Sequence, residues 1–283
     1  MLRFLTAGES HGPALTAILE GMPAGLPLTE EDIDVQLRRR QKGFGSGGRM
    51  RIERDRVRFS GGVLKGGTTG APIAMHIENR DFANWRDKEI RPMTIPRPGH
   101  ADLTAANKYG YRELRLALER ASARETAARV AVGAVCRRLL AEFGIAVGGY
   151  VVQIGPVSVS LLENLGYGDR FALAEESDVR WPDAASAGAM RACIQEAMAA
   201  RDTVGGIFEI VALDVPPGLG SHVHWDRRLD ARLMAAVGSI PAIKGVEVGP
   251  AFENAAHRGT KVHDEILVED GRLVRCTNRA GGF

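Results

Sequence analysis

Short stretches of the chain alternate apolar with polar residues, which is the period-two pattern of half-buried β-strands. The pattern predicts strands at 2–6, 14–19, 51–59, 71–77, 149–159 and 206–215, and a final pair at 265–268 and 272–276. Asp270-Gly271 lies between the final pair and is typical of a two-residue hairpin turn. Short strands therefore recur along the whole chain.

A helical period is found in other segments and predicts helices at 29–37, 122–144, 186–200 and 226–237. Thr29 and Asp32 have the spacing of a helix cap, and Ser122 and Glu125 have the spacing of a capping box. The segment 80–102 is rich in proline and charge, so we expect it to be irregular. Strands and helices are thus interspersed.

A weak internal repeat links the two halves of the chain. A turn at 22–26 followed by Asp34-x-x-Leu37 has a counterpart at 215–219 followed by Asp226-x-x-Leu229. The repeat indicates a duplicated architecture, and chance similarity between turns rich in glycine and proline is the alternative.

Composition narrows the class of protein without identifying it. The chain has 283 residues, 45% of them hydrophobic, which suffices for one large domain or two small ones. Its net charge of +2 gives no general attraction to nucleic acids or membranes. Three widely spaced cysteines in no metal-binding pattern indicate reduced thiols in a cytosolic protein. We expect no signal peptide and no membrane span, because the apolar runs are too short.

The segment 38–51 is a basic, glycine-rich loop with six cationic residues, namely Arg38, Arg39, Arg40, Lys42, Arg49 and Arg51. Such a run is commonly a solvated face, and an RNA-contacting arm is a second alternative. Phe44 is the single aromatic residue in it. A groove for a small polyanion is therefore favoured, because guanidinium groups bind carboxylates and phosphates in a bidentate way.

The segment Gly8-Glu9-Ser10-His11-Gly12 has the G-x-S-x-G spacing of the nucleophile turn of serine hydrolases. That turn requires a helix after the serine, whereas Pro13 and an alternating strand pattern follow here. We therefore interpret the segment as a polar turn that presents Ser10 and His11 to a pocket. A histidine with a purely structural role is the alternative.

Two further segments are candidates for anion binding. Arg97-Pro-Gly-His100 places an arginine and a histidine around a tight turn. Ser122 begins a predicted helix and is flanked by Arg120 and Arg124, so backbone N–H groups and guanidinium groups converge there. Ordinary helix capping is the alternative for this second segment.

A metal site is not expected. His222 and His224 would share one face of a strand, but no third ligand of matching type lies nearby in the sequence. A structural role or a position at the edge of a pocket is the favoured interpretation for both histidines.

Taken in order, these segments resemble the chorismate synthase family. The segment 8–23, GESHGPALTAILEGMP, resembles the family's first signature, and 119–130, ERASARETAARV, resembles the second. Shorter matches lie at 38–41, 68–73, 97–102, 218–221, 224–226, 239–246, 262–265 and 277–282. The resemblance spans essentially the whole chain.

The resemblance implies a reaction. Family members convert 5-enolpyruvylshikimate 3-phosphate to chorismate and phosphate, the last step of the shikimate pathway to aromatic amino acids. The reaction is a 1,4-elimination that needs reduced FMN, so the chain would be an FMN-dependent carbon–oxygen lyase. NADPH would enter indirectly, as the source of reduced flavin, and an external flavin reductase is expected because no reductase segment is evident. The implied assembly is a cytoplasmic homotetramer with no nucleic-acid or membrane partner.

The same resemblance assigns roles to residues. His11 would protonate the departing phosphate, and His100 would keep the reduced flavin in its correct protonation state. The implied substrate-binding residues are Ser10, Arg40, Arg49, Arg97 and Arg124. The implied FMN-binding residues are Arg120, Ala121, Ser122, Pro241 and Ala242. Arg40 and Ser46 would contact NADP, although Ser46 stands where the family commonly has arginine.

The implied fold is α+β: a β-α-β sandwich with helices between two antiparallel sheets, an internal pseudo-two-fold repeat and a single domain over 1–283. Family members continue past the position of Phe283 with a glycine loop, a Lys-Pro segment and an Arg-x-Asp motif. We therefore expect the C-terminal part of the family fold to be absent. A truncated, catalytically inactive member that folds or binds ligand only is the alternative function.

Overall fold

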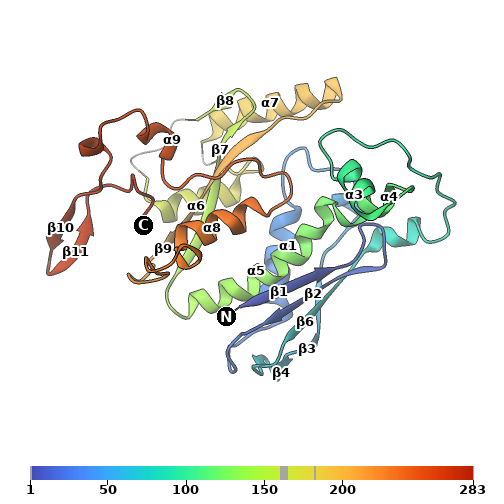
Figure 1. Cartoon of the computed structure of the whole chain (residues 1–283), viewed down its shortest axis with the longest axis horizontal. Coiled ribbons are helices and arrows are strands. Elements are labelled where there is room, and N and C mark those ends of the chain that lie inside the picture. Colours follow the sequence, from blue (N-terminus) through green and yellow to red (C-terminus); the bar gives the residue numbers. More distant parts are fainter. Residues whose placement is uncertain (1, 160–164, 182, 283) are drawn as a thin grey trace. The chain divides into compact units, whose positions relative to one another are not determined.

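The computed structural model describes residues 2–159, 165–181 and 183–282 (Figure 1). The chain divides into two compact units, Met1–Val215 and Pro216–Phe283. The larger unit contains two main sheets with their helices, and the smaller contains short helices and one hairpin. In the described part of the chain, every helix is too short or too polar to cross a membrane.

The first sheet of the larger unit is antiparallel and has the strand order β1-β2-β6-β3. Its strands are β1 (Arg3–Ala7), β2 (Ala14–Glu20), β6 (Ile73–Glu78) and β3 (Val57–Gly61). Alternate residues of β2 and β6 are buried, which confirms the period-two predictions at 14–19 and 71–77. A small separate hairpin consists of β4 (Val63–Leu64) and β5 (Gly67–Thr68).

The predicted strand at 51–59 is wrong in its first half. Arg49–Ile52 forms a short helix, α2, and β3 begins only at Val57. Burial still alternates from Glu53 through Asp55, because both carboxylates turn inward and bind arginine side chains. The period-two pattern therefore came partly from buried charge rather than from strand pairing.

Helices α1 (Glu30–Gln41) and α5 (Thr126–Ala141) pack on the inner face of the first sheet. The buried side chains of α5 are all alanine or valine, so its backbone lies close to the sheet. With leucine, isoleucine and methionine side chains from the strands they form one hydrophobic core. Because α5 also contacts a strand of the second sheet, helices lie between two antiparallel sheets, as expected (Figure 1).

The two predicted helix caps have different outcomes. Thr29 and Asp32 form the capping box with both of its hydrogen bonds. The box predicted at Ser122 is wrong: its hydroxyl accepts the N–H of Arg124, a 3-10 turn η2 (Ala123–Glu125) follows, and α5 begins one residue later. Glu125, the other half of that predicted box, instead binds side chains of the strand β1 and of α5.

The second sheet has the order β8-β7-β9, with β8 (Val157–Ser158), β7 (Ala146–Ile154) and β9 (Gly206–Leu213). Helices α6 (Tyr167–Glu176) and α7 (Ala184–Ala200) pack against it around a core that includes Tyr150, Trp181 and Met190. The strand predicted at 206–215 and the helix predicted at 186–200 are confirmed with shifted ends. The single strand predicted at 149–159 is wrong in its second half, because the chain turns after Ile154 and returns as the antiparallel strand β8.

Between β6 and η2, the chain forms only short elements. They are η1 (Arg80–Asn84), α3 (Asp102–Tyr109) and α4 (Arg115–Arg120). The irregular segment predicted at 80–102 contains the 3-10 turn η1 and otherwise no helix or strand before α3. η1 and α4 carry Asp81, Glu119 and Arg120 of the site described below.

The smaller unit consists of η3 (Trp225–Arg227), α8 (Leu229–Gly238), α9 (Ala251–Asn254), η4 (Gly259–Lys261), β10 (Ile266–Glu269) and β11 (Arg272–Arg275). Asp270 and Gly271 have φ angles of 51° and 74°, as the predicted hairpin turn requires. The helix predicted at 226–237 corresponds to η3 and α8. No described residue of 216–282 is buried.

The two segments of the predicted internal repeat share only the order of a turn followed by a helix. The turn at 22–26 precedes α1, and the turn at 215–219 precedes α8. Asp34 is buried and accepts the N–H of Val57, whereas Asp226 is exposed beside His224. The duplicated architecture therefore stays a prediction.

Candidate active site

The polar turn between β1 and β2 is held by one amide side chain. Nδ2 of Asn79 donates at 2.8 to 3.3 Å to three carbonyl oxygens of the turn, those of Glu9, Ser10 and Gly12. Gly8 has a φ of 108°, and a Cβ there would lie 2.4 Å from the carbonyl oxygen of Ala14. The turn leads directly into β2, so the helix of a serine-hydrolase nucleophile turn is not formed.

Ser10 is buried at the centre of this turn. Its Oγ accepts a hydrogen bond from Nη1 of Arg49 at 2.7 Å and another from Oγ of Ser122 at 3.0 Å. Its N–H donates to the carbonyl oxygen of Glu119 at 3.0 Å. The structure thus brings together three residues that lie far apart in sequence and were all assigned to the site.

His11 is fixed by an acidic residue and an aromatic ring. Its Nδ1 lies 2.9 Å from Oε1 of Glu119, and its backbone N–H donates to Oε2 of the same residue at 2.7 Å. The indole of Trp85 packs on the imidazole with ring centroids 4.2 Å apart. With 21% of its side chain exposed, His11 remains accessible from solvent.

Asp81 holds Trp85 in place. Its carboxylate accepts from Nδ2 of Asn84 and from Nε1 of Trp85, both at 2.9 Å. The hydrogen bond from Asn84, together with that from Trp85 and the nearby charges of Arg49 and His11, lowers the pKa of Asp81 against the opposing effect of burial. Asp81 therefore stays ionised and adds a negative charge near His11.

A buried charge cluster lies beneath the turn. Arg124 is 3% exposed; its Nη1 binds both carboxylate oxygens of Asp55 at 2.7 and 2.8 Å, and its Nε donates to Oδ1 of Asn79 at 2.8 Å. Glu53 links this cluster to the surface, because it lies 3.8 Å from Arg124 and 3.0 Å from Arg49. Buried charges of this kind persist only with partners.

Arg40 lies beside the same cluster and makes mixed contacts. Its Nε donates to Oγ1 of Thr126 at 3.0 Å, its Nη2 donates to the carbonyl oxygen of Ala123 at 3.2 Å, and its Nη1 lies 3.4 Å from Asp55. Burial lowers the pKa of Arg40, while the charge of Asp55 opposes that effect. The residue is thus adjacent to Arg124 and partly covered.

The second predicted turn forms a local pair. Nε and Nη2 of Arg97 bind the two oxygens of Asp102 at 2.8 and 2.9 Å. These bonds lower the pKa of Asp102 to about 2 and raise that of Arg97. His100 is exposed, and its Nδ1 lies 2.9 Å from the carbonyl oxygen of Pro98. Among the described contacts, none joins this turn to His11.

The residues assigned to FMN lie in both units. Nη2 of Arg120 donates to the carbonyl oxygen and the hydroxyl of Thr6, and Ala121 caps the end of α4. Pro241 and Ala242 are exposed in the smaller unit, and Ala242 has a φ of 71°, which is unusual for a residue other than glycine. Ser46, assigned to NADP, is exposed in the loop after α1.

Several residues of the cluster were missed by sequence analysis, namely Glu53, Asn79, Asp81, Trp85 and Glu119. Glu119 could have been found, because it is the first residue of the second signature segment. The others carried no signal beyond a polar or aromatic residue near the end of a predicted element. Nδ1 of His224 lies 3.1 Å from Oδ1 of Asp226, and in the described ranges no group of three or more His, Cys, Asp or Glu side chains is arranged to hold a metal ion.

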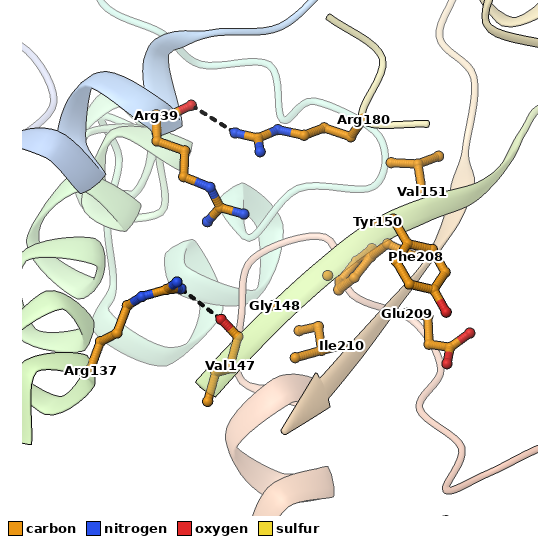
Figure 2. A pocket seen from close by; sticks show the side chains of 11 residues that line it. Arg39, Arg137, Val147, Gly148, Tyr150, Val151, Arg180, Phe208, Glu209 and Ile210 are labelled. Carbon is orange, nitrogen blue, oxygen red and sulfur yellow. Dashed lines mark hydrogen bonds between the residues drawn. The ribbon is translucent and has the colours of Figure 1, made fainter. Parts of the chain in front are cut away.

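A separate cavity of about 360 Å³ lies between α1, α5 and the second sheet of the larger unit (Figure 2). Arg39, Arg137 and Arg180 line one side of it, and apolar residues of β7 and β9 line the other. Nη1 of Arg137 donates to the carbonyl oxygen of Val147, and Nη2 of Arg180 donates to that of Arg39. None of the residues assigned to catalysis or ligand binding lines this cavity.

The fold and the His11 cluster define an α+β protein with a histidine-centred, arginine-rich site of the kind that receives small anionic molecules. The family model for chorismate synthase matches residues 2–283. Among curated proteins, the chorismate synthase of Aquifex aeolicus is 52% identical over 99% of this chain and 75% of its own length. That of Rubrobacter xylanophilus is 54% identical over 99% of this chain and 73% of its own length.

A solved structure agrees with these sequences. A crystal structure of chorismate synthase superimposes with a TM-score of 0.86 at 47% sequence identity, covering 100% of this chain and 79% of that one. The chain belongs to the chorismate synthase family. The resemblance and the α+β sandwich predicted from the sequence are confirmed.

Proposed function

We propose that the chain catalyses the 1,4-elimination of phosphate from 5-enolpyruvylshikimate 3-phosphate to give chorismate, with reduced FMN as cofactor. The observation that carries this proposal is the fixed imidazole of His11, held by Glu119 and Trp85 beside the Ser10–Arg49 contact. A proton delivered at the leaving oxygen relieves the charge that develops on departing phosphate. His11 is the proposed donor of that proton.

Cationic side chains suit a substrate that carries one phosphate and two carboxylates. Arg49 and Arg97 keep 19% and 38% of their side chains exposed, so an anion can reach both. Arg40 and Arg124 have protein acceptors, and we propose that they act through their positive field and by fixing Asp55. All four arginines are proposed substrate-binding residues, with Ser10.

The residues at the end of α4 fit a flavin with a phosphate group. Arg120 has 47% of its side chain exposed and only one terminal nitrogen engaged by Thr6, which suits a phosphate contact. We propose that Ala121, Ser122, Pro241 and Ala242 complete the FMN-binding residues and that His100 lies near the flavin. When bound, the reduced flavin supplies transient electron density and accepts the departing hydrogen. The protein orients both molecules and holds the proton at His11.

Other properties follow from the same proposal. NADPH acts as the distant source of reducing equivalents, with Arg40 and Ser46 as its proposed contacts and an external flavin reductase as the partner. The working assembly is a cytoplasmic homotetramer.

The proposal is tested by measuring phosphate release from the substrate with chemically reduced FMN under anaerobic conditions. We expect release that depends on both substrate and reduced flavin. A second form of the protein, continued to the length of its relatives, is assayed in parallel. FMN binding without phosphate release from either form would contradict the proposal and support the alternative of a member that only binds ligand. Strongly salt-dependent RNA binding would support the RNA alternative for 38–51.

A further inference from the structure

Glu119 makes four contacts, with Ser10, His11 and Arg115. Its carboxylate accepts the backbone N–H of His11 at 2.7 Å, contacts Nδ1 of His11 at 2.9 and 3.1 Å, and binds Nη2 of Arg115 at 2.9 Å. Its carbonyl oxygen accepts the N–H of Ser10 at 3.0 Å. One residue near the end of α4 thus fixes both the backbone and the ring of the turn.

We infer that Glu119 is a positioning residue that selects the imidazole tautomer of His11 with a proton on Nδ1. An ionised carboxylate only accepts hydrogen bonds, so a ring nitrogen 2.9 Å away must carry a hydrogen. Nε2 is then the nitrogen that exchanges a proton with a ligand.

Trp85 and Arg115 help to hold the imidazole of His11 in this orientation. Trp85 covers one face of the imidazole, and its own Nε1 is held by Asp81 at 2.9 Å. The guanidinium of Arg115 lies 4.8 Å from the Trp85 ring centroid while it binds Glu119. Rotation of the imidazole would therefore break the contact with Glu119 and disturb the packing against Trp85, whose ring plane is tilted 46° from the imidazole.

Two carboxylates lie near His11, those of Glu119 and Asp81. Each has a cationic neighbour of its own: Arg115 binds Glu119 at 2.9 Å, and Arg49 lies 3.8 Å from Asp81. Among the hydrogen bonds of the described residues, only those of Glu119 reach a ring nitrogen of His11. Its removal should therefore change the tautomer, whereas removal of a more distant carboxylate should not.

The test is Glu119→Gln in the whole chain, with Glu113→Gln as the matched control. Glu113 belongs to the same segment and binds the backbone N–H groups of Met93 and Arg115, so its loss leaves the His11 ring contacts intact. Nitrogen-15 NMR of labelled imidazoles reports which ring nitrogen of His11 is protonated. We expect the Nδ1–H form in the native protein and in Glu113→Gln, and a mixture of tautomers in Glu119→Gln.

Activity provides the second readout, because this inference rests on the proposed role of His11 as proton donor. In Glu119→Gln, kcat for phosphate release should fall about 10- to 100-fold with little change in KM. Glu119→Asp should recover part of the rate. If Glu119→Gln folds poorly, the same NMR measurement on Glu119→Asp, where the contact is lengthened, carries the test.

The outcomes separate the two claims. An unchanged His11 tautomer in Glu119→Gln would overturn the inference, whatever happens to the rate. A changed tautomer with an unchanged rate would support Glu119 as the orienting residue and contradict His11 as the proton donor. A changed tautomer with a lower kcat and an unchanged KM supports both.

Discussion

Two turns of the larger unit carry the same types of residue in different surroundings. His11, in the turn after β1, contacts Glu119, 108 positions along the chain, and packs on Trp85. His100, in the turn before α3, is exposed and lies 2.9 Å from a carbonyl oxygen only two positions away. Long-range contacts, rather than the residue types, therefore distinguish a fixed imidazole from an exposed one.

The arginine–aspartate pair beneath the first turn differs from that of the second turn in the exposure of its arginine. Arg124 and Asp55 are 69 positions apart, and their side chains are 2% and 0% exposed. Arg97 and Asp102 are five positions apart, and their side chains are 38% and 0% exposed. Both partners of the first pair are therefore buried, whereas solvent reaches the guanidinium of Arg97 and weakens the second pair.

The largest expected effect is on stability. Arg124→Met should lower the free energy of unfolding by about 3–5 kcal/mol, because Asp55 would be left buried and uncompensated. Arg97→Met should cost less, about 1–2 kcal/mol, because Asp102, although buried, keeps the backbone N–H of residue 97 and its place in the first turn of α3. Urea-induced unfolding of both variants measures the difference. Equal losses would contradict the comparison, and adding Asp55→Asn to Arg124→Met should recover part of the stability.

The lowered pKa of Asp102 predicts that the stability of the turn before α3 depends on pH. Its folded-state pKa of about 2 lies below the ordinary aspartate value of about 3.9. The contribution to stability is therefore present above about pH 4 and is lost as the pH falls towards 2. It should amount to about 2 kcal/mol or less, since solvent around Arg97 weakens the pair.

The measurement is the difference in unfolding free energy between the native protein and Asp102→Asn at pH 7 and near pH 2.5. The difference should shrink as the pH falls. A difference that does not depend on pH would mean that Asp102 acts by its shape or its hydrogen bonds rather than by its charge.

The smallest expected effect concerns the ring that covers His11. Trp85→Phe keeps an aromatic face but loses the hydrogen bond from Nε1 to Asp81, so stability should fall by about 1 kcal/mol. Turnover should fall only a few-fold, because Glu119 still holds the imidazole. Thermal unfolding and phosphate release measure the two effects. A rate loss as large as that of Glu119→Gln would show that stacking, not the carboxylate, sets the orientation.

The sequence predicted most strands and helices because their patterns are local. Thr29 and Asp32 are three positions apart, and both hydrogen bonds of their cap formed. The start of α5 was wrong because Ser122 is drawn to Ser10 and Glu125 is drawn to Thr6, contacts that span more than a hundred positions. No local pattern reports such a competition.

The site follows the same division. The glycine turn and its histidine were recognisable from residue order, as was the cluster of arginines. The residues that hold them could not be recognised from residue order. Asn79 contacts the turn from the end of β6, and Glu53 acts on it through Arg49 of α2, so both depend on the tertiary fold. The sequence also did not show which arginine is buried, since neither the prolines beside Arg97 nor the residues beside Arg124 report burial.

The measurement that tests the account most directly is the rate of phosphate release by His11→Ala relative to the native protein. It is made anaerobically with reduced FMN at saturating substrate, with His100→Ala in parallel and FMN binding measured for each. We predict that His11→Ala lowers the rate by about 100-fold or more while FMN binding is kept. A native-like rate from His11→Ala would contradict the assignment of His11 as the proton donor.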